Sequence, residues 1–178
     1  MFDLNRSRRL VALSMLCLSA LGACRESGAE GEYFAVSGRL VVFNYRVATA
    51  TYVVTLKPLR PMADGQVAVA SFEDPAGGEP IVVEQKVWPK LDKVTLESPP
   101  LRCIVKDRPY AVAVVIRDPA GNELQRLETT LVSDANQAEM LPDAPLVVGP
   151  LYTANPELSG HPDGRLPGNV NEACGSNG

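Results

Sequence analysis

Apolar residues alternate with polar ones at a period of two through most of this chain, from Tyr33 to Tyr152. That period places successive side chains on opposite faces of a strand, whereas an amphipathic helix needs a period near 3.6. Fifteen prolines and fourteen glycines among 178 residues interrupt the pattern with frequent turns. We therefore predict an all-β fold, an antiparallel β-sandwich or barrel-like domain of about seven or eight short strands. The candidate strands lie near residues 36–42, 52–56, 67–72, 81–87, 94–97, 110–116, 124–131 and 146–148.

The strand predicted at 110–116 is nearly all apolar, so we expect a central strand that is buried on both faces. Two tetrapeptides, Asp74-Pro-Ala-Gly77 and Asp118-Pro-Ala-Gly121, have the residue preferences of a type I turn. Their likeness reflects either an internal duplication whose sequence has diverged or the independent use of the same turn-forming residues in two hairpins. Residues 133–140 are the one candidate helical turn, with Ser133 or Asp134 as its N-cap.

The first 23 residues have the pattern of an export signal, with Arg6, Arg8 and Arg9 before an apolar run at 10–22. The run ends in Leu21-Gly-Ala-Cys24, which resembles a bacterial lipobox. The resemblance implies a lipoprotein signal peptide at 1–23 and lipidation of Cys24. The alternative is an ordinary secretory signal in which Cys24 is incidental.

Lipidation of Cys24 predicts a protein that is anchored to a membrane without spanning it. Position 25 is Arg and not Asp, which by enterobacterial sorting rules favours the outer membrane on its periplasmic side. We expect residues 24–32 to form a flexible tether, 33–152 the β-sandwich domain and 153–178 an irregular Pro/Gly-rich tail. Removing residues 1–23 takes away three Arg and one Asp, which changes the net charge from −4 to −6.

Of the four cysteines, Cys17 belongs to the signal and Cys24 to the lipobox. The remaining pair, Cys103 and Cys174, is predicted to form a disulfide bond in an oxidising compartment. That bond ties the tail to the body. The alternative is two unpaired thiols, with Cys103 buried as a small apolar residue.

We find no pattern of residues that predicts catalysis, a cofactor or a metal site. His161 is the one histidine and lies among turn-forming residues. Asp134, Glu139 and Asp143 match no calcium loop and are better explained as a solvated acidic face. The negative net charge argues against nucleic acid as a partner.

Two segments are candidates for contact with a protein partner. Trp88 precedes a proline at a strand end, where an aromatic side chain either anchors a partner or caps the core. The apolar run 140–152 contains three prolines, which exclude it from a central strand. The run is either an edge segment that accepts a strand from a partner or donates one to it, or a closing strand packed over the sandwich. The candidate partner-binding residues are Trp88, Leu146, Val147, Val148, Leu151 and Tyr152.

From Val36 to Val148 the chain resembles the YbaY-type lipoproteins and the related type III secretion pilotins. The resemblance rests on the lipobox, the segment Val36-Ser-Gly-Arg-Leu-Val-Val42 and the strand Arg108–Ile116 with its following hairpin. It implies a β-sandwich lipoprotein of the outer membrane that assists a secretion complex. The longer Cys-containing tail and the two Asp-Pro-Ala-Gly turns depart from the family pattern, and no functional residues carry over.

These observations predict a non-enzymatic, lipid-anchored periplasmic lipoprotein that binds a protein partner as an accessory factor of an envelope or secretion complex. The alternative is a lipoprotein that binds a small ligand or acts as an inhibitor, with a pocket between its sheets.

Overall fold

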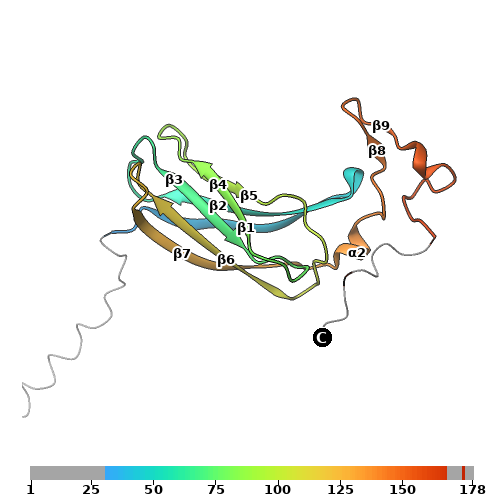
Figure 1. The fold of residues 1–178 in the computed structure, drawn as a ribbon, viewed down its shortest axis with the longest axis horizontal. Helices are drawn as coiled ribbons and strands as arrows, with labels where there is room; N and C mark the ends of the chain where they lie inside the picture. The colour runs from blue at the N-terminus through green and yellow to red at the C-terminus, as the bar shows by residue number, and fades with distance from the viewer. Residues whose placement is uncertain (1–30, 168–173, 175–178) are drawn as a thin grey trace, which may run out of the picture. The chain divides into compact units, whose positions relative to one another are not determined.

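A computed structural model describes residues 31–167 and Cys174. The chain from Glu32 onward forms one compact unit with two packed antiparallel sheets (Figure 1). One sheet has the order β1-β2-β5, with β1 at Phe34–Asn44, β2 at Thr49–Pro58 and β5 at Val94–Glu97. The other has the order β4-β3-β6-β7, with β3 at Val67–Phe72, β4 at Ile81–Lys86, β6 at Pro109–Arg117 and β7 at Glu123–Val132. The predicted all-β fold is confirmed as an open sandwich and not a closed barrel.

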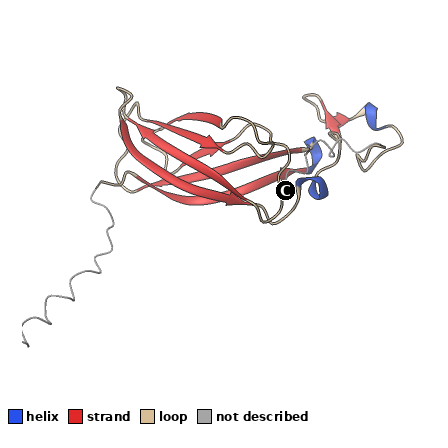
Figure 2. Cartoon of the chain, turned by 60° about the horizontal axis from the view of Figure 1, so that its bottom comes forward, coloured by secondary structure: helices blue, strands red, loops and turns tan. Residues whose placement is uncertain are grey.

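The antiparallel connections give the sandwich two distinct ends. We call the end where β1 begins the entry end; the loops at 59–66, 87–93 and 118–122 lie there. The opposite far end carries the short helices, as Figure 2 shows. It also carries the hairpin of β8 and β9. The far-end elements are η1 at Tyr45–Val47, α2 at Gln137–Met140, η2 at Pro156–Leu158, β8 at Val147–Val148 and β9 at Thr153–Ala154.

The alternation seen in the sequence sorts side chains between the core and the outer faces. In β2 the residues at every second position, from Ala50 to Leu56, are fully buried. Three aromatic rings fill the space between the sheets. Tyr52 lies 5.9 Å from Phe72 and 5.6 Å from Tyr110, measured between ring centroids. The core is thus packed by large side chains from both layers.

Strand β6 is an inner strand of its sheet, and the prediction that both of its faces are buried holds only in part, since Val115 is buried on the outer face but Ala111 is not. Tyr110, Val112 and Val114 point into the core, whereas Ala111 is exposed on the outer face. No third layer covers this face in the described part of the chain. The small side chains there limit the apolar area that water meets.

The two Asp-Pro-Ala-Gly segments form turns with the same hydrogen bonds. The amide of Gly77 donates to the carbonyl of Asp74 at 3.0 Å, and Gly121 donates to Asp118 at 2.9 Å. Each Asp side chain also accepts a hydrogen bond from the amide two residues on. The first turn lies at the far end and the second at the entry end, and their geometry does not test a duplication.

The predicted helical turn is present as α2, but its predicted caps are wrong. Asn136 is the N-cap, two to three residues beyond Ser133 and Asp134. Ser133 is buried, and its hydroxyl group bonds the backbone of Ala135. That local bond holds Ser133 in the loop that precedes the helix.

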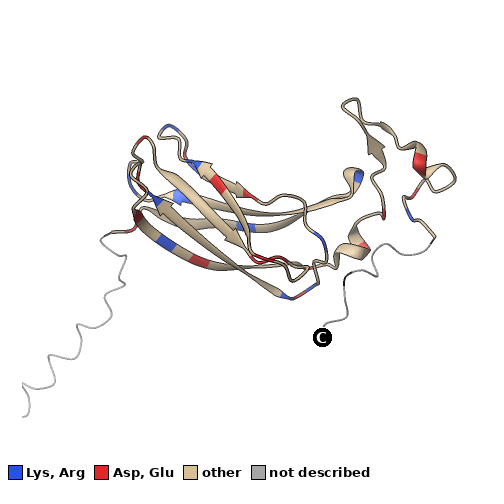
Figure 3. Ribbon diagram, in the orientation of Figure 1, with Lys and Arg blue, Asp and Glu red and all other residues tan. Residues whose placement is uncertain are grey.

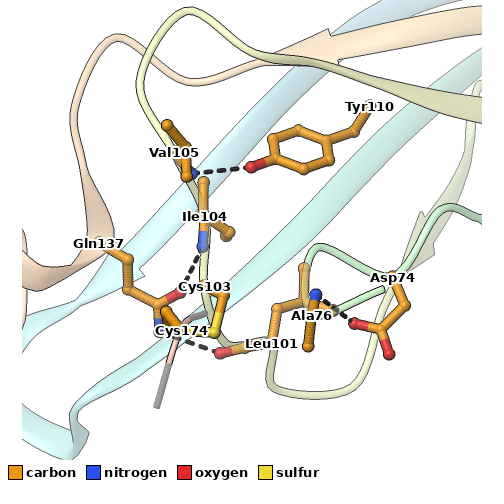
Figure 4. Close-up of a disulfide and its surroundings, with 9 residues drawn as sticks. All are labelled: Asp74, Ala76, Leu101, Cys103, Ile104, Val105, Tyr110, Gln137 and Cys174. Atoms are coloured by element: carbon orange, nitrogen blue, oxygen red, sulfur yellow. Dashed lines mark hydrogen bonds between the residues drawn. A yellow bond between two sulfur atoms is a disulfide. The ribbon is translucent and has the colours of Figure 1, made fainter. Parts of the chain in front are cut away.

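The predicted disulfide bond between Cys103 and Cys174 is present (Figure 4). Cys103 has a φ of 67°, in the left-handed region that few non-glycine residues adopt. The Gln137 side chain holds the adjoining loop on both sides, accepting from the Ile104 amide at 3.2 Å and donating to the Leu101 carbonyl at 3.0 Å. The loop that carries Cys103 is therefore fixed to α2 as well as to the tail.

A side chain joins the two sheets where β1 and β7 run along each other without pairing. The Gln125 amide oxygen accepts from the backbone of Tyr33 and Phe34 at 2.8 and 2.9 Å. Its nitrogen donates to the Phe34 carbonyl at 2.9 Å. Gln125 thus supplies to the start of β1 the hydrogen bonds that a neighbouring strand would make.

Candidate functional site

The six candidate partner-binding residues do not form one site. Trp88 lies at the entry end, in the loop after β4, and the other five lie at the far end, in and beside the β8–β9 hairpin. In an antiparallel chain successive loops alternate between the two ends. Trp88 follows the fourth strand and residues 146–152 follow the seventh, so a count of strands predicts their separation.

The far-end hairpin exposes two large side chains at its tip. Leu151 is 84% exposed and Tyr152 is 60% exposed, whereas Leu146, Val147 and Val148 are partly buried. Tyr152 has a φ of 52°, a left-handed conformation that is rare for a bulky residue and costs about 1 kcal/mol or more. The predicted boundary between Tyr152 and Thr153 falls inside this hairpin, because β8 pairs with β9 across it.

Contacts with η1 hold the hairpin in place, and a buried side chain ties its two flanks together. The Leu146 amide donates to the Arg46 carbonyl at 2.9 Å, and the Arg46 guanidinium lies 5.6 Å from the centre of the Tyr152 ring. Asn155 is buried, and its side chain donates to the Pro145 carbonyl at 2.8 Å. The run 140–152 is therefore divided: Leu141 is buried in the core, whereas β8 pairs with β9 and with neither sheet of the sandwich.

Trp88 is half exposed at the entry end, beside a lysine. The Nζ atom of Lys86 lies 4.4 Å from the ring centre, a distance suited to a cation–π contact. Val87 is fully buried between them, and its amide donates to the Gln66 carbonyl at 2.9 Å. The core is therefore filled by Val87, and Trp88 projects from a fixed backbone.

A hollow of about 810 Å³ lies on the outer face of the four-stranded sheet, not between the sheets. Small side chains form its floor, and acidic and basic side chains line its margin. Glu73 there accepts from Arg108 at 2.8 Å and from the Ala111 amide at 2.9 Å. The sequence does not predict this hollow, because alternation alone does not show where small residues of three strands adjoin. Its lining includes Arg39, Ser71, Glu73, Ala111, Ala113 and Glu128.

Among residues 31–167, two ionisable groups have clearly displaced pKa values. Burial raises the pKa of Tyr52 far above its ordinary value of 10.0, and neighbouring charges such as Glu73 add to the effect. The Asn122 side chain and backbone hydrogen bonds lower the pKa of Asp118 below its ordinary 3.8. Tyr52 belongs to the core and Asp118 to a turn, so neither points to catalytic chemistry.

Cys24 and the predicted signal at 1–23 lie outside the described residues, as does most of the predicted tether at 24–32. Over residues 31–167, no helix has the length and apolarity needed to cross a bilayer. Among the same residues, no three His, Cys, Asp or Glu side chains group in a way that could hold a metal ion.

No protein-family model matches this chain, and no curated protein matches it. Solved structures of β-glucuronidases from Bacteroides uniformis share 12–13% identity, with TM-scores of 0.35 to 0.40. The aligned part covers 54–61% of this chain but only 13–14% of those chains. This likeness carries no argument about function, and the resemblance to YbaY-type lipoproteins and pilotins stays a prediction.

Proposed function

We propose that this protein is a non-enzymatic, lipid-anchored envelope protein that binds a protein partner through the far-end hairpin. The lipobox at Cys24 supports the anchor, and Arg25 supports the periplasmic side of the outer membrane. An accessory role in an envelope or secretion complex follows from the resemblance described above.

The observation that carries the proposal is the exposed pair Leu151 and Tyr152. Large apolar and aromatic side chains that project from a fixed backbone supply binding energy, because they lose little entropy when a partner covers them. The left-handed backbone at Tyr152 is a further sign of function, since strain of this kind gathers at binding sites. Arg46 lies against Tyr152 and is also of a residue type common at interface hot spots.

The test is co-purification from detergent-solubilised membranes. We expect a defined envelope protein to accompany the wild type and to be lost with the double variant L151S/Y152S. Val82, which is 64% exposed on β4, provides a matched control: V82S removes an exposed apolar side chain elsewhere and should keep the partner. Equal recovery with L151S/Y152S and with V82S would refute the role of the hairpin.

A second candidate function, binding of a small ligand, is favoured by the hollow on the outer face of the four-stranded sheet. Ala113 lies in its lining and is only partly buried, so A113L would fill space there without entering the core. If a small ligand binds in this hollow, A113L abolishes a ligand-induced rise in Tm and leaves partner recovery unchanged. If the hairpin is the functional site, L151S/Y152S has the decisive effect.

A further inference from the structure

The entry end exposes three large apolar side chains, which lie on two neighbouring loops. Leu59 is 50% exposed, Trp88 50% and Leu91 53%. The Leu91 amide donates to the Trp88 carbonyl at 3.0 Å, so a tight turn carries both side chains. Leu59 directly follows the end of β2, which pairs with β5 next to Leu91. These three side chains lie at the opposite end of the sandwich from the far-end hairpin, so they are not part of the proposed partner-binding site.

Together with the strand ends that flank them, these two loops are basic in a protein that is acidic as a whole. Segments 57–66 and 86–93 contain five basic residues and two acidic ones, a net charge of about +3. Residues 32–167 contain thirteen basic and seventeen acidic residues, so eight basic and fifteen acidic ones remain elsewhere, about −7. Figure 3 shows Lys and Arg on loops at this end of the sandwich. The five basic residues are Lys57, Arg60, Lys86, Lys90 and Lys93.

Apolar and basic side chains around the loop after β4 line one hollow. A hollow of about 280 Å³ is lined by Lys86, Trp88, Leu91 and Lys93 together. Asp64 lies 3.9 Å from Lys86, but both side chains are largely exposed, so this pair neutralises little of the charge. The pairing of β2 with β5 places Lys57, Leu59 and Arg60 at the same end of the sandwich, and we call them together with residues 86–93 the entry-end surface.

The domain begins beside this surface. The Arg60 side chain donates to the Glu32 carbonyl at 3.0 Å, and the Leu59 amide donates to the Tyr33 carbonyl at 2.9 Å. Glu32 lies eight positions after Cys24, a chain length that spans at most about 28 Å. A lipid on Cys24 therefore keeps the entry-end surface close to the bilayer.

We propose that the entry-end surface rests on an anionic phospholipid bilayer, with Trp88 and Leu91 in the interfacial region. Tryptophan prefers this region, because its ring is apolar and its N–H group hydrogen-bonds. Lysine and arginine are attracted to anionic headgroups, and they oppose the repulsion that the acidic remainder of the domain meets. The proposal rests on the lipid anchor of the proposed function and adds an orientation, with the far-end hairpin directed away from the membrane.

Trp88 is the one tryptophan of the chain, so its fluorescence reports this contact directly. The full-length protein, purified from membranes, is mixed with vesicles of phosphatidylcholine alone or with phosphatidylglycerol added. Brominated acyl chains serve as the quencher. Flotation with the neutral vesicles tests the anchor, and quenching of Trp88 in the anionic vesicles tests the surface. We expect flotation with both kinds of vesicle and strong quenching only with the anionic ones.

Variants give the size of the effect. Each basic residue near an anionic surface contributes about 1 kcal/mol of binding free energy. K90Q and K93Q should therefore each lower about fivefold the ratio of molecules with Trp88 at the bilayer to molecules with Trp88 in water. L91S should lower it too, whereas K106Q in the β5–β6 loop at the far end should leave it unchanged. Quenching and flotation with anionic but not neutral vesicles would support the surface and refute the anchor. Absence of quenching from the anionic vesicles overturns the proposal, whether or not the protein floats with the neutral ones.

Discussion

Replacing Tyr52 by Phe should stabilise the domain, although it removes a polar group from a well-packed core. The Tyr52 hydroxyl group is buried and has no hydrogen-bond partner among the described residues. A buried hydroxyl without a partner costs about 1–3 kcal/mol, and Phe fills the same space without that cost. We therefore expect Y52F to raise the free energy of unfolding by about 1 kcal/mol, or Tm by about 3 °C for a domain of this size.

Tyr110 provides the matched control, because its ring packs against that of Tyr52 in the same core. Its hydroxyl oxygen accepts a hydrogen bond from the Val105 amide at 2.7 Å, so Y110F breaks a bond and should lower stability by about 1 kcal/mol. Urea unfolding of both variants measures the two changes, which have opposite signs. If Y52F destabilises as much as Y110F, the Tyr52 hydroxyl group has a partner and the reasoning fails.

The same pair has a signature at high pH. Burial raises the pKa of Tyr52 in the folded state above the value of 10.0 expected in the unfolded chain. The unfolded state therefore loses the proton first, and the wild type loses stability as the pH rises above 10. Y52F lacks this ionisable group, so its advantage over the wild type should grow between about pH 10 and pH 11. An advantage that stays constant over this range would contradict the burial of the hydroxyl group.

Three further perturbations test other parts of the fold. C103S removes a cross-link between residues 71 apart in the sequence and should lower the free energy of unfolding, measured in urea, by about 4 kcal/mol. If a reductant leaves the stability of the wild type unchanged, the bond is not formed. Q125A removes three hydrogen bonds to the start of β1 and should speed amide exchange at Phe34, whereas Q85A, which loses one bond to the adjacent residue, should not. The lowered pKa of Asp118 makes stability fall as the pH drops below 3.8 toward the folded-state value, and D118N should remove that part of the acid sensitivity; identical acid titrations for D118N and wild type would contradict it.

The alternation of apolar residues was enough to predict the strands of the two packed sheets and most of the core. It fails for the first half of β6, because an apolar run indicates burial without showing whether a second layer covers the strand. Ala111 is exposed there. Its small side chain, and not the apolar run as a whole, indicates that this face lacks a covering layer. The pattern also cannot show which strands pair, since a period of two fixes the face of a residue and not its neighbour.

The candidate site was harder to predict than the fold. The sequence indicated Trp88 and Tyr152 as candidate partner-binding residues. They lie at opposite ends of the sandwich, because the loops that carry them follow strands of opposite direction. The bridge that Gln125 makes to β1 joins residues about ninety apart, and no local pattern marks it. The cysteine pair was predictable because so few cysteines were left to combine.

The most direct test of the central claim is photocrosslinking in intact cells. A photoreactive amino acid at position 151 should yield one defined adduct with an envelope protein, because Leu151 is the most exposed large apolar side chain of the far-end hairpin. The same group at position 82, which is exposed on the sandwich, should yield none, and Y152S should abolish the adduct at 151. Equal adducts at positions 82 and 151, or an adduct at 151 that persists in Y152S, would contradict the claim that the hairpin binds the partner.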